Sequence, residues 1–392
     1  MAVMASAHLP TLAGGPAEMD HSGIREISNI AITLPGTIRL DVGQPNFPTP
    51  AHISKAGKDA IDNGFTFYTH TQGLVGLRER LVEKIERVNG YRVTPERIAC
   101  AVGGVGALAA SLAAVLNVGD EVLLPDPGWP NYRMMPPWMG ARSVFYPLLP
   151  ERGYLPDLEA LERSVSPRTK ALVINSPANP TGAVFPRSVM EAIAEFALRH
   201  DLWLISDECY DQVVFEGEHV SPATLLGDGR VISIYTFSKT YAMTGWRLGY
   251  AVGSADLIDS VTKVLESNTS GPNTIAQKAA EAALDGPQDC VSEMIEAYRR
   301  RRDLVTDILQ EAGLLITVPQ GAFYIMADVS GSGLASRDFA MRMVRERGVS
   351  IAPGSAFGKV AGGAVRISLA SSDEDLREGV GRICDAVGEW TQ

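Results

Sequence analysis

From about residue 98 onwards, short runs of β-branched and other apolar residues alternate with segments of helical periodicity. The first run is IACAV at 98–102, and the helical segment GALAASLAAVLN follows it. The later runs are EVLLP, SVFYPL, KALVINSP, LWLISDE, VISIYTF and LGYAVG, and the helical segment SVMEAIAEFALRH lies between KALVINSP and LWLISDE. This alternation predicts an α/β fold whose large domain contains a mostly parallel, doubly wound sheet of seven strands.

Polar or glycine-containing clusters follow five of these runs. They are GGVG after IACAV, DPGW after EVLLP, NPTG after KALVINSP, DECY after LWLIS, and SKT after VISIYTF. Ligands of doubly wound sheets bind beyond the carboxyl ends of the strands. We therefore expect the five strand ends to meet at one pocket.

The chain of 392 residues is too long for a single hydrophobic core of ordinary size, so we expect two domains. The second part predicts a long amphipathic helix near 291–312, a helix near 336–347, a strand pair in VSIAPG and AVRISLA, and a helix capped by Ser371 or Ser372. The expected divisions are a flexible tail at 1–18, a first segment of a small α+β domain at 19–43, the large domain at 44–285, and the rest of the small domain at 286–392.

Charge and composition exclude several classes of function. The formal net charge of -11 argues against a nucleic-acid partner or an anionic membrane surface, since both attract clustered Lys and Arg. The four cysteines form no CxxC pair and the six histidines lack metal-ligand spacing, so we predict neither a disulfide framework nor a metal site. With no apolar stretch of about 18 residues and no signal-peptide pattern, we expect a cytoplasmic protein with no membrane partner.

One stretch after the run VISIY has unusual chemistry. It reads TFSKTYAMTGWRLGY at 236–250, and places Lys239 between hydroxyl side chains with Arg247 eight residues further on. Alone, such a lysine is usually a surface residue, NPTG is an ordinary turn, and GGVG is a weak signal for phosphate. Their conjunction in this order resembles the pyridoxal-phosphate-dependent aminotransferases of fold type I, class I/II. The resemblance extends from IREI at 24 to RISLA at 370.

The resemblance implies that Lys239 forms an imine, the internal aldimine, with the aldehyde of pyridoxal 5'-phosphate and carries protons during catalysis. An amine must be deprotonated to attack an aldehyde, and a closed, cationic pocket lowers the pKa of a lysine. Arg247 matches the family's phosphate ligand, whose guanidinium offers bidentate donors to the dianion. Asp207 of SDECY matches the carboxylate that keeps the ring nitrogen protonated, so that the ring can accept electrons.

The remaining contacts of the cofactor are implied in the same way. Tyr210 and Asn179 match groups that hydrogen-bond to the 3-oxygen of the ring, and Trp129 matches the aromatic residue that stacks on it. The phosphate-side groups are the hydroxyls of Thr236 and Ser238 and the backbone N–H groups of Gly104, Val105 and Gly106, which open a helix. The implied catalytic residues are Lys239, Asp207 and Tyr210.

For the substrate, Arg366 of AVRISLA matches the clamp for the α-carboxylate, and the backbone of Gly43 in LDVGQPNF matches a donor on its other side. Trp129 and Asn179 are also expected to contact the substrate. A carboxylate held near the imine plane leaves the Cα–H bond perpendicular to the π system, so a proton is lost and Lys239 can shuttle it. The implied reaction is transamination between an α-amino acid and a 2-oxo acid, such as 2-oxoglutarate or pyruvate, by a ping-pong mechanism.

The stretch FTFYTHTQGLVGLRERL resembles the family segment YTxxxGxxxLR. In the family this tyrosine crosses a two-fold interface to the phosphate of the neighbouring subunit's cofactor. The resemblance therefore implies a homodimer with shared active sites, in which Tyr68 has that role. The local pattern leaves open the alternative that Tyr68 packs inside its own chain.

Two positions depart from the family pattern. Relatives often carry a hydroxyl, Lys or Gln in the GGxx turn, where this chain has Val105 and Gly106, and aspartate-type relatives present an arginine near LESNTSGPN, where it has Glu266. The second departure weighs against a dedicated aspartate enzyme. A β- or γ-eliminating lyase or a cyclising synthase of the same fold would retain the same lysine, aspartate and arginines. A ligand-sensing module is a further alternative, although no basic helix-turn-helix segment precedes the motifs.

Overall fold

The computed structural model describes residues 13–17, 19, 21–226 and 229–390. The flexible tail predicted for residues 1–18 falls mostly outside this part of the chain. Within it, the short helix α1 (Gly14–Ala17) lies against α6 (Pro130–Trp138). No helix of the described residues is long and apolar enough to cross a membrane.

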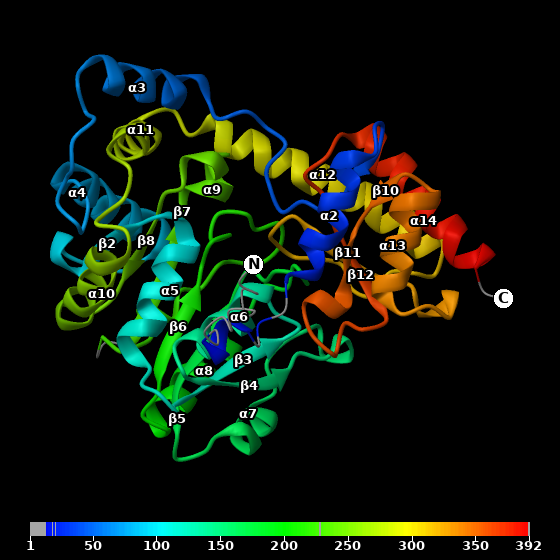
Figure 1. Cartoon of the computed structure of the whole chain (residues 1–392), viewed down its shortest axis with the longest axis horizontal. Helices are drawn as coiled ribbons and strands as arrows, with labels where there is room; N and C mark the ends of the chain where they lie inside the picture. The colour runs from blue at the N-terminus through cyan, green and yellow to red at the C-terminus, as the bar shows by residue number, and fades with distance from the viewer. Residues whose placement is uncertain (1–12, 18, 20, 227–228, 391–392) are drawn as a thin grey trace, which may run out of the picture.

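Seven strands form the large sheet, in the order β2-β8-β7-β6-β5-β3-β4 (Figure 1). They are β2 (Ile98–Ala101), β3 (Glu121–Asp126), β4 (Arg142–Pro147), β5 (Thr169–Asn175), β6 (Trp203–Asp207), β7 (Val231–Thr236) and β8 (Gly249–Val252). Strand β8 is antiparallel to both of its neighbours, and all other neighbouring strands are parallel. The prediction of a mostly parallel, seven-stranded sheet is confirmed.

Helices cover both faces of this sheet, which is why its strands are nearly continuous apolar runs. These helices are α4 (Val75–Lys84), α5 (Gly103–Val115), α7 (Leu158–Ser164), α8 (Arg187–Arg199), α10 (Ala255–Asn268) and α11 (Thr274–Asp285), together with α6. Side chains alternate between the faces, so Val122 and Leu124 pack with α5 and α6 while Leu123 packs with α7 and α8. Helix α10 lies on the face of Val122, and α4 and α11 cover the opposite face beside β2 and β8.

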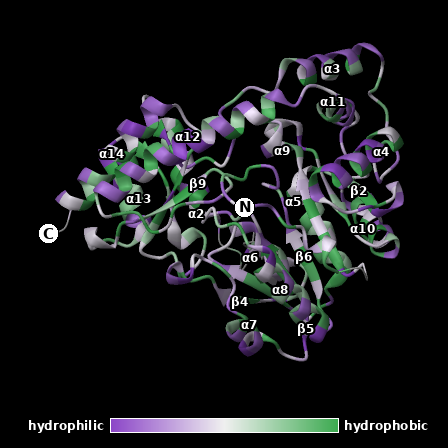
Figure 2. Ribbon diagram, turned by 180° about the vertical axis from the view of Figure 1, so that it is seen from behind, coloured by the Kyte–Doolittle hydropathy of each residue, from purple (hydrophilic) through white to green (hydrophobic). Residues whose placement is uncertain are grey.

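A second group of elements lies beside the large sheet, at the right of Figure 1. It contains an antiparallel sheet of β11, β12 and β9 and a parallel pair of β1 and β10. Figure 2 shows hydrophilic and hydrophobic bands along its helices, as expected for helices that bury one face. The elements are α2 (Gly23–Thr33), β1 (Ile38–Arg39), α12 (Asp289–Glu311), β9 (Tyr324–Asp328), α13 (Ser336–Glu346), β10 (Val349–Ser350), β11 (Ala352–Pro353), β12 (Ala364–Ser368) and α14 (Asp373–Glu389).

The segment VSIAPG is predicted as one strand, but the structure divides it at the buried Ile351. Strand β10 pairs with β1 near the start of the chain, whereas β11 pairs with β12. A local pattern cannot show that one run serves two sheets, because the partner of β10 lies about 310 residues away in sequence. The helix predicted after this region is α14, and its N-cap is Ser372, whose side chain accepts from the backbone N–H of Asp375.

The N-terminal segment packs with the C-terminal part of the chain. The backbone N–H of Leu40 donates to the carbonyl of Ser350 (2.9 Å), and the carbonyl of Leu40 accepts from Ser368 (2.8 Å). Ile27 and Ala31 of α2 belong to the same hydrophobic core as α12, α13 and α14. These contacts support grouping 19–43 with 286–392 in one small domain, while the exact boundaries stay predictions.

Gly249, at the start of β8, allows the N-terminus of α5 to lie directly against the sheet. A Cβ there would lie 2.5 Å from the backbone nitrogen of Gly104, so Gly249→Ala would force the two segments apart. We expect this variant to lower the free energy of unfolding by about 1–3 kcal/mol, the usual cost of overpacking. Gly245→Ala is the control, because nothing lies within 4 Å of a Cβ at that position. Chemical denaturation followed by circular dichroism checks the difference, and equal midpoints would contradict it.

Candidate active site

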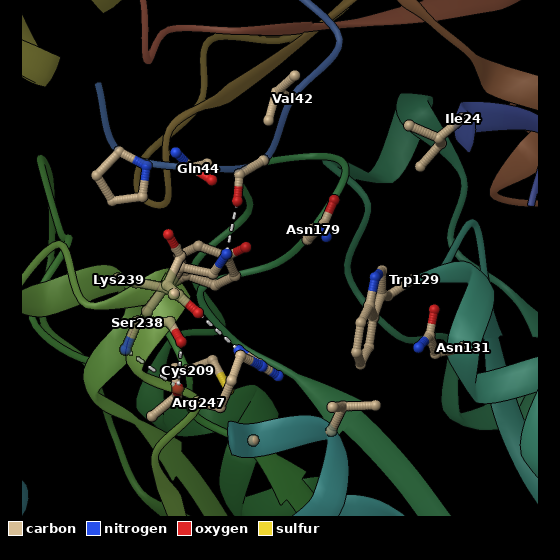
Figure 3. Close-up of a pocket in the computed structure, with 18 of the residues that line it drawn as sticks. Ile24, Val42, Gln44, Trp129, Asn131, Asn179, Cys209, Ser238, Lys239 and Arg247 are labelled. Atoms are coloured by element: carbon tan, nitrogen blue, oxygen red, sulfur yellow. Dashed lines mark hydrogen bonds between the residues drawn. The ribbon is translucent and has the colours of Figure 1, made fainter. Parts of the chain in front are cut away.

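The clusters at the five strand ends line one cavity of about 1390 Å³ (Figure 3). Residues of the second group of elements, among them Tyr324, complete its wall. The predicted site residues that line the cavity are Gly43, Gly104, Val105, Trp129, Asn179, Asp207, Tyr210, Thr236, Ser238, Lys239, Arg247 and Arg366. The structure thus brings together all the predicted site residues except Gly106, which lies in the first turn of α5, and Tyr68.

Lys239 projects from the short helix α9 (Phe237–Thr240), which begins where β7 ends. The hydroxyl of Thr236 caps this helix by accepting a backbone N–H bond of 3.2 Å. The side-chain nitrogen of Lys239 donates to the carbonyl oxygen of Gly43 at 2.6 Å (Figure 3). Burial lowers the pKa of Lys239 to about 8, and the nearby cation of Arg366 acts in the same direction. An appreciable fraction of the amine is therefore neutral near neutral pH, as a nucleophile requires.

Asp207 ends β6 and is buried. Its Oδ2 accepts a hydrogen bond from the hydroxyl of Tyr132 (2.5 Å), and its Oδ1 accepts from the backbone N–H of Cys209 (3.1 Å). Burial raises the pKa of the Asp207 carboxyl, while these hydrogen bonds oppose the rise. The sequence analysis missed Tyr132. The sequence does contain a hint of its position, because Tyr132 follows Trp129 by three residues. This spacing places both aromatic rings on one side of the start of α6.

Arg247 is held by local backbone geometry at the glycine-rich end of the cavity. Its φ of 55° is in the left-handed region, and its Nη1 donates to the carbonyl of Thr244 (2.9 Å). Gly103, the first residue of α5, lies so close that a Cβ there would be 2.5 Å from Nη2 of Arg247. Within the described part of the chain, no carboxylate forms an ion pair with Arg247. The guanidinium and the first N–H groups of α5 are therefore available to an anion.

Arg366 on β12 is 2% exposed and is fixed from two sides. Its Nη1 donates to Oδ1 of Asn179 (2.9 Å), and its Nη2 donates to the backbone carbonyl of Asp41 (2.6 Å). Its guanidinium also lies over the ring of Tyr324, 4.2 Å from the centroid. The Nε atom is buried without a hydrogen-bond partner among the described residues. A buried cation with a free donor and no carboxylate bound to it is suited to an anionic ligand.

Two further residues that the sequence analysis missed hold predicted site residues in place. The side chain of Asn175 accepts from the backbone N–H of Asn179 (2.7 Å) and donates to the carbonyl of Asp207 (2.9 Å). The hydroxyl of Tyr324 lies 2.8 Å from that of Tyr210. A Cβ at Gly43 would be 2.4 Å from the same Tyr324 hydroxyl, so the close approach requires glycine. No local motif marks Tyr324, because it reaches the site from β9.

Tyr68 lies outside the cavity of its own chain. Its side chain is 95% exposed, beside Phe67, which is 80% exposed, and both line a second hollow with residues 270–275. The alternative that Tyr68 packs inside its own chain is therefore wrong. Its proposed action on another subunit stays a prediction.

Comparisons with known proteins agree on one class. A family model described as "Aminotransferase class I and II" matches residues 35–383. The aspartate/prephenate aminotransferase of Thermus thermophilus is 42% identical over 354 residues, covering 90% of this chain and 91% of that protein. The arginine–pyruvate transaminase of Pseudomonas aeruginosa is 40% identical over 352 residues, covering 89% and 90%. The structure of Thermus thermophilus aspartate aminotransferase with maleate matches with a TM-score of 0.92 and 39% identity, covering 96% of this chain and 100% of that chain.

The chain therefore belongs to the aminotransferase class I and II family, and its fold is that of the fold type I enzymes. It is a transaminase of the EC 2.6.1 type. The comparisons favour this activity over the lyase or cyclising synthase of the same fold.

The lowered pKa of Lys239 predicts an unusual pH profile for its reactivity. In cofactor-free protein, its rate of modification by a small aldehyde and borohydride should rise with pH and level off above about 8, because the amine is then neutral. Lys263 is the internal control, since its hydrogen bond with Asp259 raises its pKa above the usual 10.5. Its rate should still rise at pH 10. Mass spectrometry of the two peptides measures both rates, and parallel profiles would contradict the prediction.

Proposed function

We propose that this aminotransferase binds pyridoxal 5'-phosphate in the cavity around Lys239 and moves an amino group between an α-amino acid and a 2-oxo acid by a ping-pong mechanism. The observation that carries the proposal is Lys239 itself, a partly buried amine whose pKa is lowered by desolvation to about 8. It shares its cavity with the buried carboxylate of Asp207 and with Arg366, a buried guanidinium that has a free donor.

The residues around Lys239 fit this cofactor. Arg247 and the N-terminus of α5 supply donors for a phosphate, and the absence of a Cβ at Gly103 leaves room for the guanidinium. Asp207, whose pKa is raised by burial, would be stabilised as a carboxylate by a protonated ring nitrogen. When bound, pyridoxal phosphate supplies an aldehyde for an amine and a ring that takes up electrons.

Each side chain then has a task that its contacts allow. Arg366 binds the α-carboxylate of the substrate and thereby orients its Cα–H bond. The neutral side-chain nitrogen of Lys239 takes the proton from this Cα and returns it. The Oδ1 of Asn179 is already occupied by Arg366, so its amide nitrogen remains free to donate to the 3-oxygen of the ring, together with Tyr210. Asp207 keeps the ring nitrogen protonated, and Trp129 supplies a flat apolar surface.

The amino donor is an α-amino acid whose side chain the relatives do not specify. Their names refer to aspartate and prephenate, to arginine and pyruvate, and to aromatic amino acids.

In the turn at the start of α5 this chain has Val105, which lines the cavity and carries no charge. Backbone N–H groups must therefore serve the phosphate there without help from a side chain.

We also propose a homodimer with shared active sites. Tyr68 is nearly fully exposed, and the apolar side chains of Ile61, Phe67 and Val75 around the same region are at least half exposed. Exposed apolar groups of this kind are typical of interaction surfaces. A site completed by the partner's Tyr68 would explain why Arg247 is exposed at the cavity of the single chain.

Replacing Lys239 tests the proposed function. We expect Lys239→Ala to lose the visible absorbance of the bound cofactor and to lose transamination by at least about 10³-fold, because this amine moves the proton. Lys263→Ala, at an exposed ion pair, should behave like the unmodified protein. The assay uses a panel of amino donors with two or three 2-oxo acids, with oxo-acid, ammonia and carbon dioxide release measured together. Turnover and spectrum unchanged in Lys239→Ala would refute the proposal.

Mixing two impaired variants tests the shared site. If Tyr68 acts across the interface, a mixed dimer of Tyr68→Ala and Lys239→Ala subunits contains one site with both lesions and one with neither. After subunit exchange at equal amounts, about a quarter of the activity of the unmodified dimer should return. Each parent dimer is the control for residual activity. Failure to regain activity after proven exchange, or a fully active monomer on sizing, would contradict the model.

A further inference from the structure

The segment that follows β6 has two sets of side chains that face in different directions. Asp207 and Tyr210 line the cavity, whereas Glu208 and Asp211 take part in a buried polar cluster that does not line it. Glu208 is fully buried and Asp211 is 7% exposed. The segment thus connects the cavity directly to this cluster.

Glu208 is the common partner of three side chains from two other parts of the chain. Its Oε2 accepts from the hydroxyl of Tyr235 on β7 (2.8 Å) and lies 2.8 Å from Nε2 of His219. Its Oε1 accepts from the hydroxyl of Ser221 (2.9 Å). In addition, its backbone N–H donates to the carbonyl of Ile234 (2.9 Å). One carboxylate therefore joins the ends of β6 and β7 to the loop at 219–221.

Asp211 is fixed by an irregular helix end. Helix α4 continues into the π-helical turn η1 (Ile85–Asn89). In a π-helix, residues five apart lie almost above one another, so Lys84 and Asn89 can reach the same atom. Lys84 and Asn89 (3.0 Å) both donate to Oδ2 of Asp211, and the ammonium of Lys84 also lies 4.4 Å from the centre of the Tyr235 ring. The only ammonium hydrogen-bonded within this cluster of described residues thus serves Asp211 and not Glu208.

Among the described residues, no ammonium or guanidinium is bound to the fully buried carboxylate of Glu208, and its one possible cationic partner is the imidazole of His219, which is charged only when protonated. Burying such a carboxylate is costly. Replacing such a buried polar cluster as a whole by apolar residues of similar volume is often neutral or stabilising. What the carboxylate adds is directional contact with three donors at once. Asp207 directly precedes Glu208 in the chain. Thr236 directly follows Tyr235 and caps the helix that carries Lys239.

We propose that Glu208 is a positioning residue, whose carboxylate fixes Asp207 and Lys239 relative to each other by joining the ends of β6 and β7. This inference rests on the proposed function, in which Asp207 and Lys239 act on opposite ends of one cofactor. Glu208 itself is not among the residues that line the cavity. Its effect is on the geometry of the reacting groups and not on their binding.

The test compares Glu208→Gln with Glu216→Gln in the cofactor-loaded enzyme. Glutamine keeps the shape of Glu208 but replaces one acceptor oxygen with a donor, so at least one of its three contacts must reverse its direction or be lost. We expect kcat to fall about 10- to 100-fold, as for a small misplacement of reacting groups, with KM and cofactor content changed less than about threefold. Glu216, eight residues further on, has a side chain that is 54% exposed and pairs with Arg302 away from the cavity. Its variant should keep kcat within about twofold.

The visible absorbance of the bound cofactor gives a second readout that needs no knowledge of the amino donor. We expect the pH midpoint of this band to shift in Glu208→Gln and to stay unchanged in Glu216→Gln. Tyr235→Phe removes one of the three donors to Glu208 together with the contact between the hydroxyls of Tyr235 and Tyr91. It should shift both kcat and the midpoint in the same direction by a smaller amount, and it decides the question if Glu208→Gln does not fold. Unchanged kcat and midpoint with only a lower melting temperature would overturn the proposal. If the unmodified protein showed no transaminase activity, the proposed function would be wrong. The pH midpoint of the cofactor band in Glu208→Gln, compared with the unmodified protein, would still test the role of Glu208.

Discussion

Asp207 is a carboxylate buried at the end of a central strand, where its ionised form needs hydrogen bonds and nearby cations to be stable. Much of the surrounding structure meets this requirement. Tyr132 and the backbone of Cys209 donate to its two oxygens. The amine of Lys239 lowers its pKa, although burial has the larger effect. Under the proposed function, a protonated ring nitrogen would supply further positive charge beside this carboxylate.

The direction of β8 explains why the site can form at one edge of the sheet. Because β8 is antiparallel to both β2 and β7, these two strands run in the same direction. The carboxyl end of β2 therefore brings Gly103 and the start of α5 to the edge where β7 delivers Lys239. Gly249 at the start of β8 permits the contact, since any larger residue would meet the backbone of Gly104. The donors that we propose for a phosphate and the amine of Lys239 thus come together through strand order.

The sequence was informative wherever a functional group follows a strand directly. Asp207, Lys239 and Asn179 stand at the ends of apolar runs, so their presence at one pocket followed from the topology of parallel sheets. The large sheet could be predicted because most of its strands are apolar runs buried on both faces, although the edge strand β4 is partly exposed. Local pattern failed where a contact joins distant segments. Tyr324 reaches the site from β9, and Gly103 matters because of Arg247, which is distant in sequence.

The small sheets show the same limit, since β1 and β10 are two-residue strands whose pairing has no local signal. Glu208 is a further case, because an Asp-Glu pair after a strand is usually read as a helix cap. Only the burial of Glu208 and its three donors distinguish it from that reading. The role of a residue next to a sequence motif can therefore come from contacts with distant segments of the chain, which the local sequence does not show.

Arg366 connects the two parts of the chain. It belongs to β12 of the second group of elements, but its Nη1 bonds to Asn179, which follows β5 of the large sheet, and its Nη2 bonds to the backbone of Asp41. The Nε atom of the same guanidinium is buried and has no hydrogen-bond partner among the described residues. A carboxylate bound to Arg366 would therefore contact a side chain that is hydrogen-bonded to both parts of the chain. The position of Arg366 thus depends on how the small sheet is arranged against the large one. Under the proposed function, substrate binding would therefore be linked through Arg366 to the packing of the small sheet against the large one.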